Sequence, residues 1–238
     1  MKRRLLTALA LLFAAGFVAL GIWQVERRAW KHELIAAVDA RIHRPPVAAP
    51  GPTEWPRISA SRDAYRRISA TGRFRHDRET LVQAVTTRGA GYWVLTPLET
   101  PGFTLLVNRG FVPPDKRAAT TRAAGNRGGM ITVTGLLRIS EPGGAFLRAN
   151  DAAAGRWYSR DVAAIASARG LRRVAPYFLD ADAAPNAGGY PVGGLTVVRF
   201  RDSHLVYALT WFALAALSLF FAWLLWRPAR LRSNSNAR

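Results

Sequence analysis

The chain of 238 residues contains no cysteine. This absence excludes disulfides, thiolate chemistry, cysteine-based zinc sites and iron–sulfur ligation, so any bound metal or cofactor must be held by other groups. Familiar catalytic signatures are missing as well. The sequence has no Gly-x-Ser-x-Gly, no His-Glu-x-x-His and no glycine-rich phosphate loop. These absences argue against an enzyme.

Acidic residues are also scarce, since 15 Asp and Glu stand against 34 Lys and Arg, a formal net charge of +19. Clustered cations of this kind raise nucleic acid as a partner, because they neutralise phosphates. Here the cations are spread along the chain, and no nucleic-acid-binding motif accompanies them. We expect no nucleic acid partner, and the charge better suits anionic lipid headgroups or an acidic partner.

Two long uncharged runs indicate membrane spans, residues 5–23 and 205–226. At a rise of about 1.5 Å per residue, the second run just covers a hydrocarbon core about 30 Å thick. The first run also resembles a signal peptide, but no small-x-small cleavage site follows it, which favours an uncleaved anchor. Basic residues at the outer ends of both runs predict cytoplasmic termini and a translocated central domain.

The predicted fold class is a membrane protein in which two transmembrane α-helices flank a β-rich (α+β) antiparallel extracytoplasmic domain. The domain is a sheet or partly closed barrel with one helix over 161–169, capped by Ser159 or Asp161 and stopped by Gly170. Strands are predicted over 65–74, 79–86, 91–98, 103–109, 130–139, 177–179 and 195–200, and loops over 118–129 and 181–194. The expected segments are a cytoplasmic tip 1–4, span 5–23, helical extension and Pro-rich linker 24–56, β-rich domain 57–204, span 205–226 and cytoplasmic tail 227–238.

A histidine stands at the mouth of the second span. His204 shares one helical face with Tyr207 and Trp211 and with the small residues Ala208, Ala215, Ser218 and Ala222. Imidazole is a common axial ligand of haem iron, and a flat apolar macrocycle needs aromatic and small side chains around it. The alternative is a polar cap that points to headgroups or to Gln24. The residue pattern leaves both interpretations open.

The helical pattern continues beyond the first span, where Trp23, Arg27, Trp30, Lys31 and Leu34 share a face. We name Trp23, Gln24, Arg27, Trp30 and Lys31 the collar. The pattern fits an aromatic belt with arginine at the interface, and it fits a recognition surface around the second span.

Two smaller predictions concern the first span and the remaining histidines. Ala15, Gly16 and Ala19 form a small-residue edge that we expect to face the second span. His32 precedes Glu33, but adjacent helical side chains point in different directions, and His43 and His76 are expected to be solvated.

Separated motifs then coincide with a known family. They are Trp-Gln-x-x-Arg-x-x-Trp-Lys at 23–31, Gly-Arg-Phe at 72–74, Gly-Tyr-Trp-Val-Leu-Thr-Pro at 91–97, Val-Asn-Arg-Gly-Phe-Val-Pro at 107–113 and His-Leu-Val-Tyr-Ala-Leu-Thr-Trp-Phe at 204–212. In this order over nearly the whole chain, they resemble the Surfeit locus protein one family in its bacterial form, the assembly factors of haem-copper cytochrome c oxidase.

The resemblance implies a non-enzymatic protein of the cell inner membrane, with a periplasmic central domain, that helps insert haem a into the catalytic subunit of the oxidase. The implied iron ligand is His204, with Tyr207, Trp211, Arg27 and Lys31 as further cofactor contacts. Trp23, Gln24 and Trp30 become interfacial partner contacts. Implied partners are the catalytic subunit, the enzyme of haem a synthesis and the lipid membrane. The alternative is a scaffold that stabilises an oxidase intermediate without binding haem.

Two positions carry separate expectations. The family often has Asn where this chain has Asp202, and a carboxylate there raises the proton affinity of the His204 imidazole or attracts a basic partner. Residues 108–110, Asn-Arg-Gly, are predicted to form a turn, because Gly110 permits an unusual backbone angle and Pro113-Pro114 ends the strand.

Overall fold

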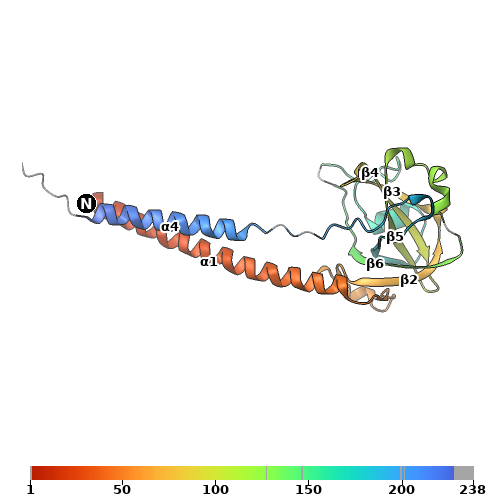
Figure 1. The fold of residues 1–238 in the computed structure, drawn as a ribbon, viewed down its shortest axis with the longest axis horizontal. Helices are drawn as coiled ribbons and strands as arrows, with labels where there is room; N and C mark the ends of the chain where they lie inside the picture. Colours follow the sequence, from red (N-terminus) through yellow and green to blue (C-terminus); the bar gives the residue numbers. More distant parts are fainter. Residues whose placement is uncertain (1, 127, 146, 199, 201, 228–238) are drawn as a thin grey trace, which may run out of the picture. The chain divides into compact units, whose positions relative to one another are not determined.

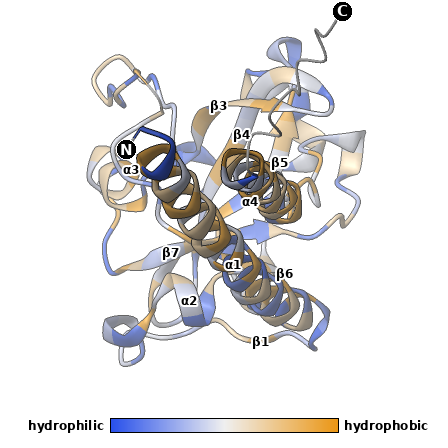
Figure 2. Cartoon of the chain, turned by 90° about the vertical axis from the view of Figure 1, so that its left-hand side faces the viewer, coloured by the Kyte–Doolittle hydropathy of each residue, from blue (hydrophilic) through white to orange (hydrophobic). Residues whose placement is uncertain are grey.

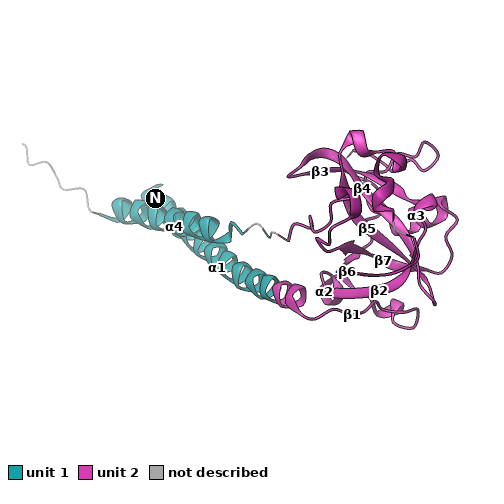
Figure 3. Ribbon diagram, turned by 45° about the vertical axis from the view of Figure 1, so that its right-hand side comes forward, with its two compact units in different colours: residues 1–36, 199–238 teal, residues 37–198 magenta. Residues whose placement is uncertain are grey.

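The computed structural model describes residues 2–126, 128–145, 147–198, 200 and 202–227. It separates the chain into two compact units (Figure 3). The helical unit comprises Met1–Ala36 with Arg199–Arg238, and the β unit comprises Ala37–Val198. Two helices are long and apolar enough to cross a membrane, α1 (Lys2–His43) and α4 (His204–Trp226). The predicted fold class, membrane helices around a β-rich domain, is confirmed.

In the helical unit, α1 and α4 form an antiparallel pair. The Arg3 guanidinium donates to the Arg227 carbonyl at one end (3.3 Å), and His204 contacts Gln24 at the other. The hydropathy colouring in Figure 2 shows that most residues of both helices are hydrophobic. α1 ends at His43 because Pro45 and Pro46 follow, and proline supplies no backbone N–H for a continuing helix.

The two helices meet along a seam of alternating three- and four-residue steps, the spacing of two helices packed side by side. Its less exposed positions are Thr7, Ala10, Ala14, Phe17, Gly21 and Gln24 on α1, and His204, Ala208, Trp211, Ala215, Ser218 and Ala222 on α4. The predicted edge of Ala15, Gly16 and Ala19 was wrong, because all three are exposed. On α1 the small residues in the seam are Ala10, Ala14 and Gly21, because only these positions match its alternating steps.

The β unit is a seven-stranded sheet in the order β1-β2-β6-β7-β5-β4-β3, and an additional β2–β4 pairing closes five of its strands into a barrel (Figure 1). Parallel pairs join β1 to β2 and β5 to β7, and the other neighbours are antiparallel. The strands are β1 (Val47–Ala48), β2 (Arg67–Phe74), β3 (Thr80–Thr86), β4 (Gly89–Glu99), β5 (Thr104–Val112), β6 (Met130–Ile139) and β7 (Val174–Ala181).

Alternation along the strands separates two apolar layers. Leu105 and Val107 of β5 belong to the inner core, to which all five barrel strands contribute, whereas Leu106 between them belongs to an outer core. The helix α3 (Val162–Ala168) covers the outer core with Val162 and Ile165. The predicted helix is confirmed, with the Asp161 carboxylate as its cap, accepting the Ala164 amide at 3.1 Å.

Six of the seven predicted strands correspond to β2 through β7. The predicted strand over 195–200 was wrong, since Leu195–Val198 form no strand. The predicted loop at 118–129 contains a 3-10 segment, η4 (Ala119–Gly125). The remaining short helices are η1 (Trp55–Arg57), α2 (Ala60–Asp63), η2 (His76–Arg78), η3 (Pro114–Lys116) and η5 (Ala187–Gly189).

The turn predicted at residues 108–110 was also wrong, because β5 runs on to Val112 and ends before Pro113. Gly110 does have the unusual angle, φ +130°. A side chain there would place its Cβ 2.1 Å from the Val192 carbonyl oxygen, so the glycine permits a close backbone approach inside a strand.

Candidate functional site

Polar side chains gather in the helical unit where the apolar runs of α1 and α4 end. His204 is the first residue of α4, and its Nδ1 lies 2.7 Å from Oε1 of Gln24, the first residue after the uncharged run of α1. An amide oxygen only accepts, so in a neutral ring with this contact Nδ1 carries the proton and Nε2 has the lone pair. A metal-binding histidine is commonly oriented in this way by a hydrogen bond to its other nitrogen. The contact predicted for a polar cap is therefore present, and it is compatible with a ligand role for the ring.

Asp202 organises a second group of side chains beside His204. Its Oδ2 lies 2.7 Å from His32 Nε2 and 3.7 Å from Arg28 Nε, while Oδ1 accepts the backbone amide of His204 at 3.1 Å. The hydrogen bond from His32 is the main cause that lowers the pKa of Asp202 below its ordinary value. The carboxylate thus contacts the basic side chains of His32 and Arg28 and accepts the first backbone amide of α4.

Sequence reasoning missed Arg28 and His32 as members of this site. The signal was present in the four-residue spacing of Gln24, Arg28 and His32, which places them along one side of α1. It was overlooked because the partner, Asp202, lies 170 positions away from His32 in the sequence.

The aromatic residues below His204 divide between two environments. Trp211 lies in the seam and stacks on Phe17 at 5.7 Å between ring centroids. Tyr207 is 53% exposed and lies outside the seam. The small residues of the predicted face, Ala208, Ala215 and Ala222, are buried in the seam. Side chains therefore fill the space between the helices, and the His204 imidazole lies at the end of the seam.

The structure also divides the collar. Trp23, Arg27 and Trp30 are exposed, and the Arg27 guanidinium lies 4.5 Å from the centre of the Trp30 ring. Gln24 and Lys31 are partly buried and continue the spacing of the seam. The collar thus presents an exposed aromatic and cationic surface on one side and polar groups near His204 on the other.

The donor set is compatible with haem rather than with a metal ion held by several side chains. Within the described residues, no group of three or more His, Asp or Glu could hold a metal ion. Haem iron is already held by its macrocycle, so one imidazole with a free lone pair suffices as the protein ligand. His204 meets this requirement.

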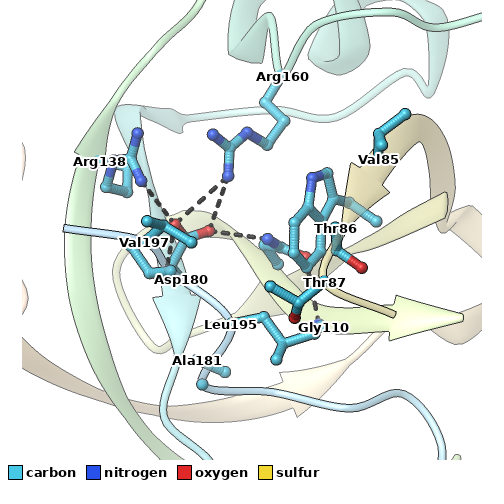
Figure 4. Close-up of a pocket in the computed structure, with 14 residues that line it drawn as sticks. Val85, Thr86, Thr87, Gly110, Arg138, Arg160, Asp180, Ala181, Leu195 and Val197 are labelled. Carbon is cyan, nitrogen blue, oxygen red and sulfur yellow. Dashed lines mark hydrogen bonds and ion pairs between the residues drawn. The ribbon is translucent and has the colours of Figure 1, made fainter. Parts of the chain in front are cut away.

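The β unit contains a polar cluster of its own, centred on the buried carboxylate of Asp180 (Figure 4). It accepts hydrogen bonds from Asn108 (2.8 Å), Arg138 (3.0 Å), Arg160 (3.1 Å) and Thr196 (3.0 Å). Burial lowers the pKa of Arg160, but attraction by Asp180 and Glu141 outweighs this, so the pKa is raised. A cavity of about 170 Å³ adjoins the cluster. Because four donors satisfy the carboxylate, we assign the cluster a structural role in joining β5, β6 and β7.

Comparison with known proteins relates both units to one family. The sequence model described as the SURF1 family matches residues 11–216, from within α1 to within α4. Surfeit locus protein 1 of Mus musculus is 36% identical over 224 residues, covering 87% of this chain and 71% of that protein. The Homo sapiens protein of the same name is 35% identical over 216 residues (83% and 69%), and a SURF1-like protein of Monosiga brevicollis is 37% identical over 215 residues (84% and 79%). The chain therefore belongs to the SURF1 family.

Proposed function

We propose that this protein is an assembly factor for a haem-copper cytochrome c oxidase, which binds haem a through His204 and assists its insertion into the catalytic subunit. It acts in the cell inner membrane, with both termini in the cytoplasm and the β unit in the periplasm. The orientation is supported by Lys2, Arg3 and Arg4 at the outer end of the first apolar run and by Arg227 at the end of the second.

The observation that carries the proposal is the contact of His204 Nδ1 with Gln24 at 2.7 Å, because it leaves Nε2 available at the end of a membrane helix. When bound, haem a supplies a redox-active iron whose properties depend on its axial ligand. Gln24 orients the ring. The Asp202 carboxylate stabilises the start of α4 by accepting the backbone amide of His204.

Arg27 and Lys31 are the cations proposed to neutralise the haem carboxylates, since charged hydrogen bonds to carboxylates are among the stronger polar contacts. Tyr207 and Trp211 contribute aromatic surface close to His204 on α4. Trp23 and Trp30 are proposed to contact the catalytic subunit or the enzyme of haem a synthesis.

An absorption spectrum tests the ligand. The full chain is produced together with haem a synthesis, purified, and its visible spectrum is recorded. We expect His204→Ala to lose most of the bound pigment and Gln24→Leu to lose part of it, because the leucine removes only the orienting hydrogen bond. His43→Ala is the control, an exposed histidine on α1, the helix that also carries Gln24. An unchanged haem spectrum in His204→Ala would refute the ligand assignment.

A scaffold without haem is the second candidate, favoured by the exposure of Trp23 (50%) and Trp30 (52%). Such large exposed aromatic surfaces are typical of protein contact sites. Under this alternative, Trp23→Ala and Arg27→Ala impair oxidase assembly while His204→Ala does not. Oxidase activity per membrane protein, measured in the three variants, separates the two candidates.

A further inference from the structure

The inner core of the barrel opens into a cavity of about 480 Å³ that contains a buried cation. Inward positions on β5 are Leu105 and Val107, and the next inward position is Arg109, which is only 5% exposed. The cavity wall also includes Phe74 of β2, Ile131 and Val133 of β6, Ala181 of β7, and Pro185 and Asn186 beyond it. Along β5 the inward-facing positions thus change from aliphatic residues to an arginine at the mouth of the barrel.

Arg109 has three polar contacts in the described part of the chain, and none of them is with a carboxylate. Its guanidinium donates to the Asn126 side chain (3.0 Å) and to the Gly125 carbonyl, and it lies 3.3 Å from His76 Nδ1. The guanidinium also lies 5.2 Å from the centre of the Phe74 ring. Among the described residues, no carboxylate forms an ion pair with Arg109.

The carboxylate that acts electrostatically on Arg109 is Glu79, and it is already hydrogen-bonded to another arginine. Glu79 accepts both terminal nitrogens of Arg122, which is itself only 4% exposed. Glu79 therefore pairs with Arg122 and not with Arg109, and the group of two buried arginines and one carboxylate keeps a positive charge. Burial, with the neighbouring charge of Arg122, lowers the pKa of Arg109 to about 10, so the guanidinium remains charged at pH 7.

A buried charge without a counter-ion is unfavourable, and an anion that enters the cavity would relieve this cost. The contacts to Asn126, Gly125 and His76 occupy three of the five N–H donors of Arg109, which leaves two for a ligand. Arg67 on the same wall pairs with Asp182 at 2.7 Å, and its buried Nε has no hydrogen-bond partner among the described residues.

We propose that this cavity is a binding site for an organic carboxylate, whose charged end pairs with Arg109 and whose apolar body packs on Phe74, Ile131 and Val133. Its volume lies within the range of about 300–1,000 Å³ usual for small-ligand sites, and barrel mouths are frequent locations for them. The same chemistry is offered by a free amphipathic carboxylate and by the acidic side chain of a partner peptide. The site lies within the β unit and goes beyond the function proposed above.

Calorimetric titration of the full chain in lipid nanodiscs tests the proposal, with two pairs of probes. The first pair is 4-phenylbutanoate and its neutral amide, and the second is the peptide acetyl-Leu-Phe-Glu-amide and its Gln counterpart. In at least one pair we expect the carboxylate to bind about tenfold more tightly or better, the ratio that one charge-assisted hydrogen bond supplies. The pair that responds identifies the source as a free ligand or a peptide.

Variants connect the preference to Arg109. Arg109→Gln should abolish the difference between carboxylate and neutral probe, whereas Arg88→Gln, an exposed arginine outside the cavity wall, should retain it. Since Arg109 also holds residues 125 and 126, unfolding of Arg109→Gln is checked by circular dichroism. Val133→Glu is the second variant, because it introduces a competing carboxylate into the wall and should weaken binding of the charged probes.

The proposal is overturned if wild-type protein binds neither pair at millimolar concentration, if charged and neutral probes bind equally, or if both Arg109→Gln and Val133→Glu retain the preference. None of these outcomes bears on haem binding, which is read from the spectrum of His204 variants. Conversely, loss of haem in those variants leaves the carboxylate titration unchanged.

Discussion

The two units of this protein place their polar groups in opposite ways. In the helical unit the apolar seam contains small residues, and the polar contacts of Gln24, His204 and Asp202 gather where the apolar runs end. In the β unit charged groups are buried, and Asp180, which is only 3% exposed, accepts hydrogen bonds from four side chains.

The difference follows from the number of hydrogen-bonding partners that each unit can offer to a buried polar group. A membrane span offers few partners to a buried charge, so polar groups are expected near its ends. In the β unit, adjacent strands and the loops beside them bring donors from several segments to one carboxylate, so that it is surrounded by hydrogen bonds. Arg109 differs from Asp180, because among the described residues it is buried without a partner of opposite charge. This is the reason for proposing a ligand there.

Removal of Asp180 should produce the largest effect and should be confined to the β unit. Asp180→Ala leaves Arg138 and Arg160 without their shared acceptor, and breaking a buried pair costs about 3–5 kcal/mol. Hydrogen–deuterium exchange should show lost protection in β5, β6 and β7, with α4 unchanged. The matched variant is Asp151→Ala, whose pair with Arg156 is largely exposed, and its loss should be far smaller. Equal losses in the two variants would contradict the assigned role of Asp180.

An enlarged residue in the seam should affect only the helical unit. A Cβ at Gly21 would lie 2.5 Å from the Phe212 ring, whereas one at Gly16 meets nothing within 4 Å. Overpacking costs about 1–3 kcal/mol, so Gly21→Leu should reduce helix pairing about fivefold or more and Gly16→Leu should not. Because the chain has no cysteine, disulfide yield between Phe17→Cys and Trp211→Cys reports the pairing directly. A similar yield in both leucine variants would show that the seam is misplaced.

The smallest effect concerns pH at the end of the seam. The pKa of Asp202 is lowered by His32, so the carboxylate contributes stability above the ordinary value near 4 and loses it as pH falls through the lower, folded value. His32→Leu should raise the pKa of Asp202 toward the ordinary value. Carbon-13 NMR of the labelled side chain measures it, with His43→Leu as the control histidine on α1. An unaltered titration in His32→Leu would contradict the assigned contact.

Local patterns predicted most of the elements and fewer of their contacts. Alternation and glycine or proline punctuation located six strands, and Asp161 marked the start of α3. Thr196 was assigned to a strand because its neighbours are apolar, although its hydroxyl serves Asp180 instead. Likewise, alanine-rich spans contain several small-residue pairs, and only the register of α4 shows that Ala14 and Gly21 form the seam.

The candidate site was predictable to a similar extent. His204 and Gln24 were recognised from their positions at the ends of two apolar runs, and the structure brings them together. His32 was set aside, since nothing adjacent in the sequence indicates its contact with Asp202. Arg109 was assigned to a turn, because its sequence neighbours resemble one and because its burial depends on residues of β2, β6 and β7, which lie far from it in the sequence.

The sequence by itself determined the two apolar spans, the strand-rich region between them and the family, because hydrophobic periodicity and motif order are properties of neighbouring residues. Only the tertiary structure decided which helix faces meet, that five strands close on themselves, and that Arg109 is buried without a carboxylate. These features depend on groups far apart in the chain, such as Gln24 with His204, whose approach is set by register and closure of the folded elements.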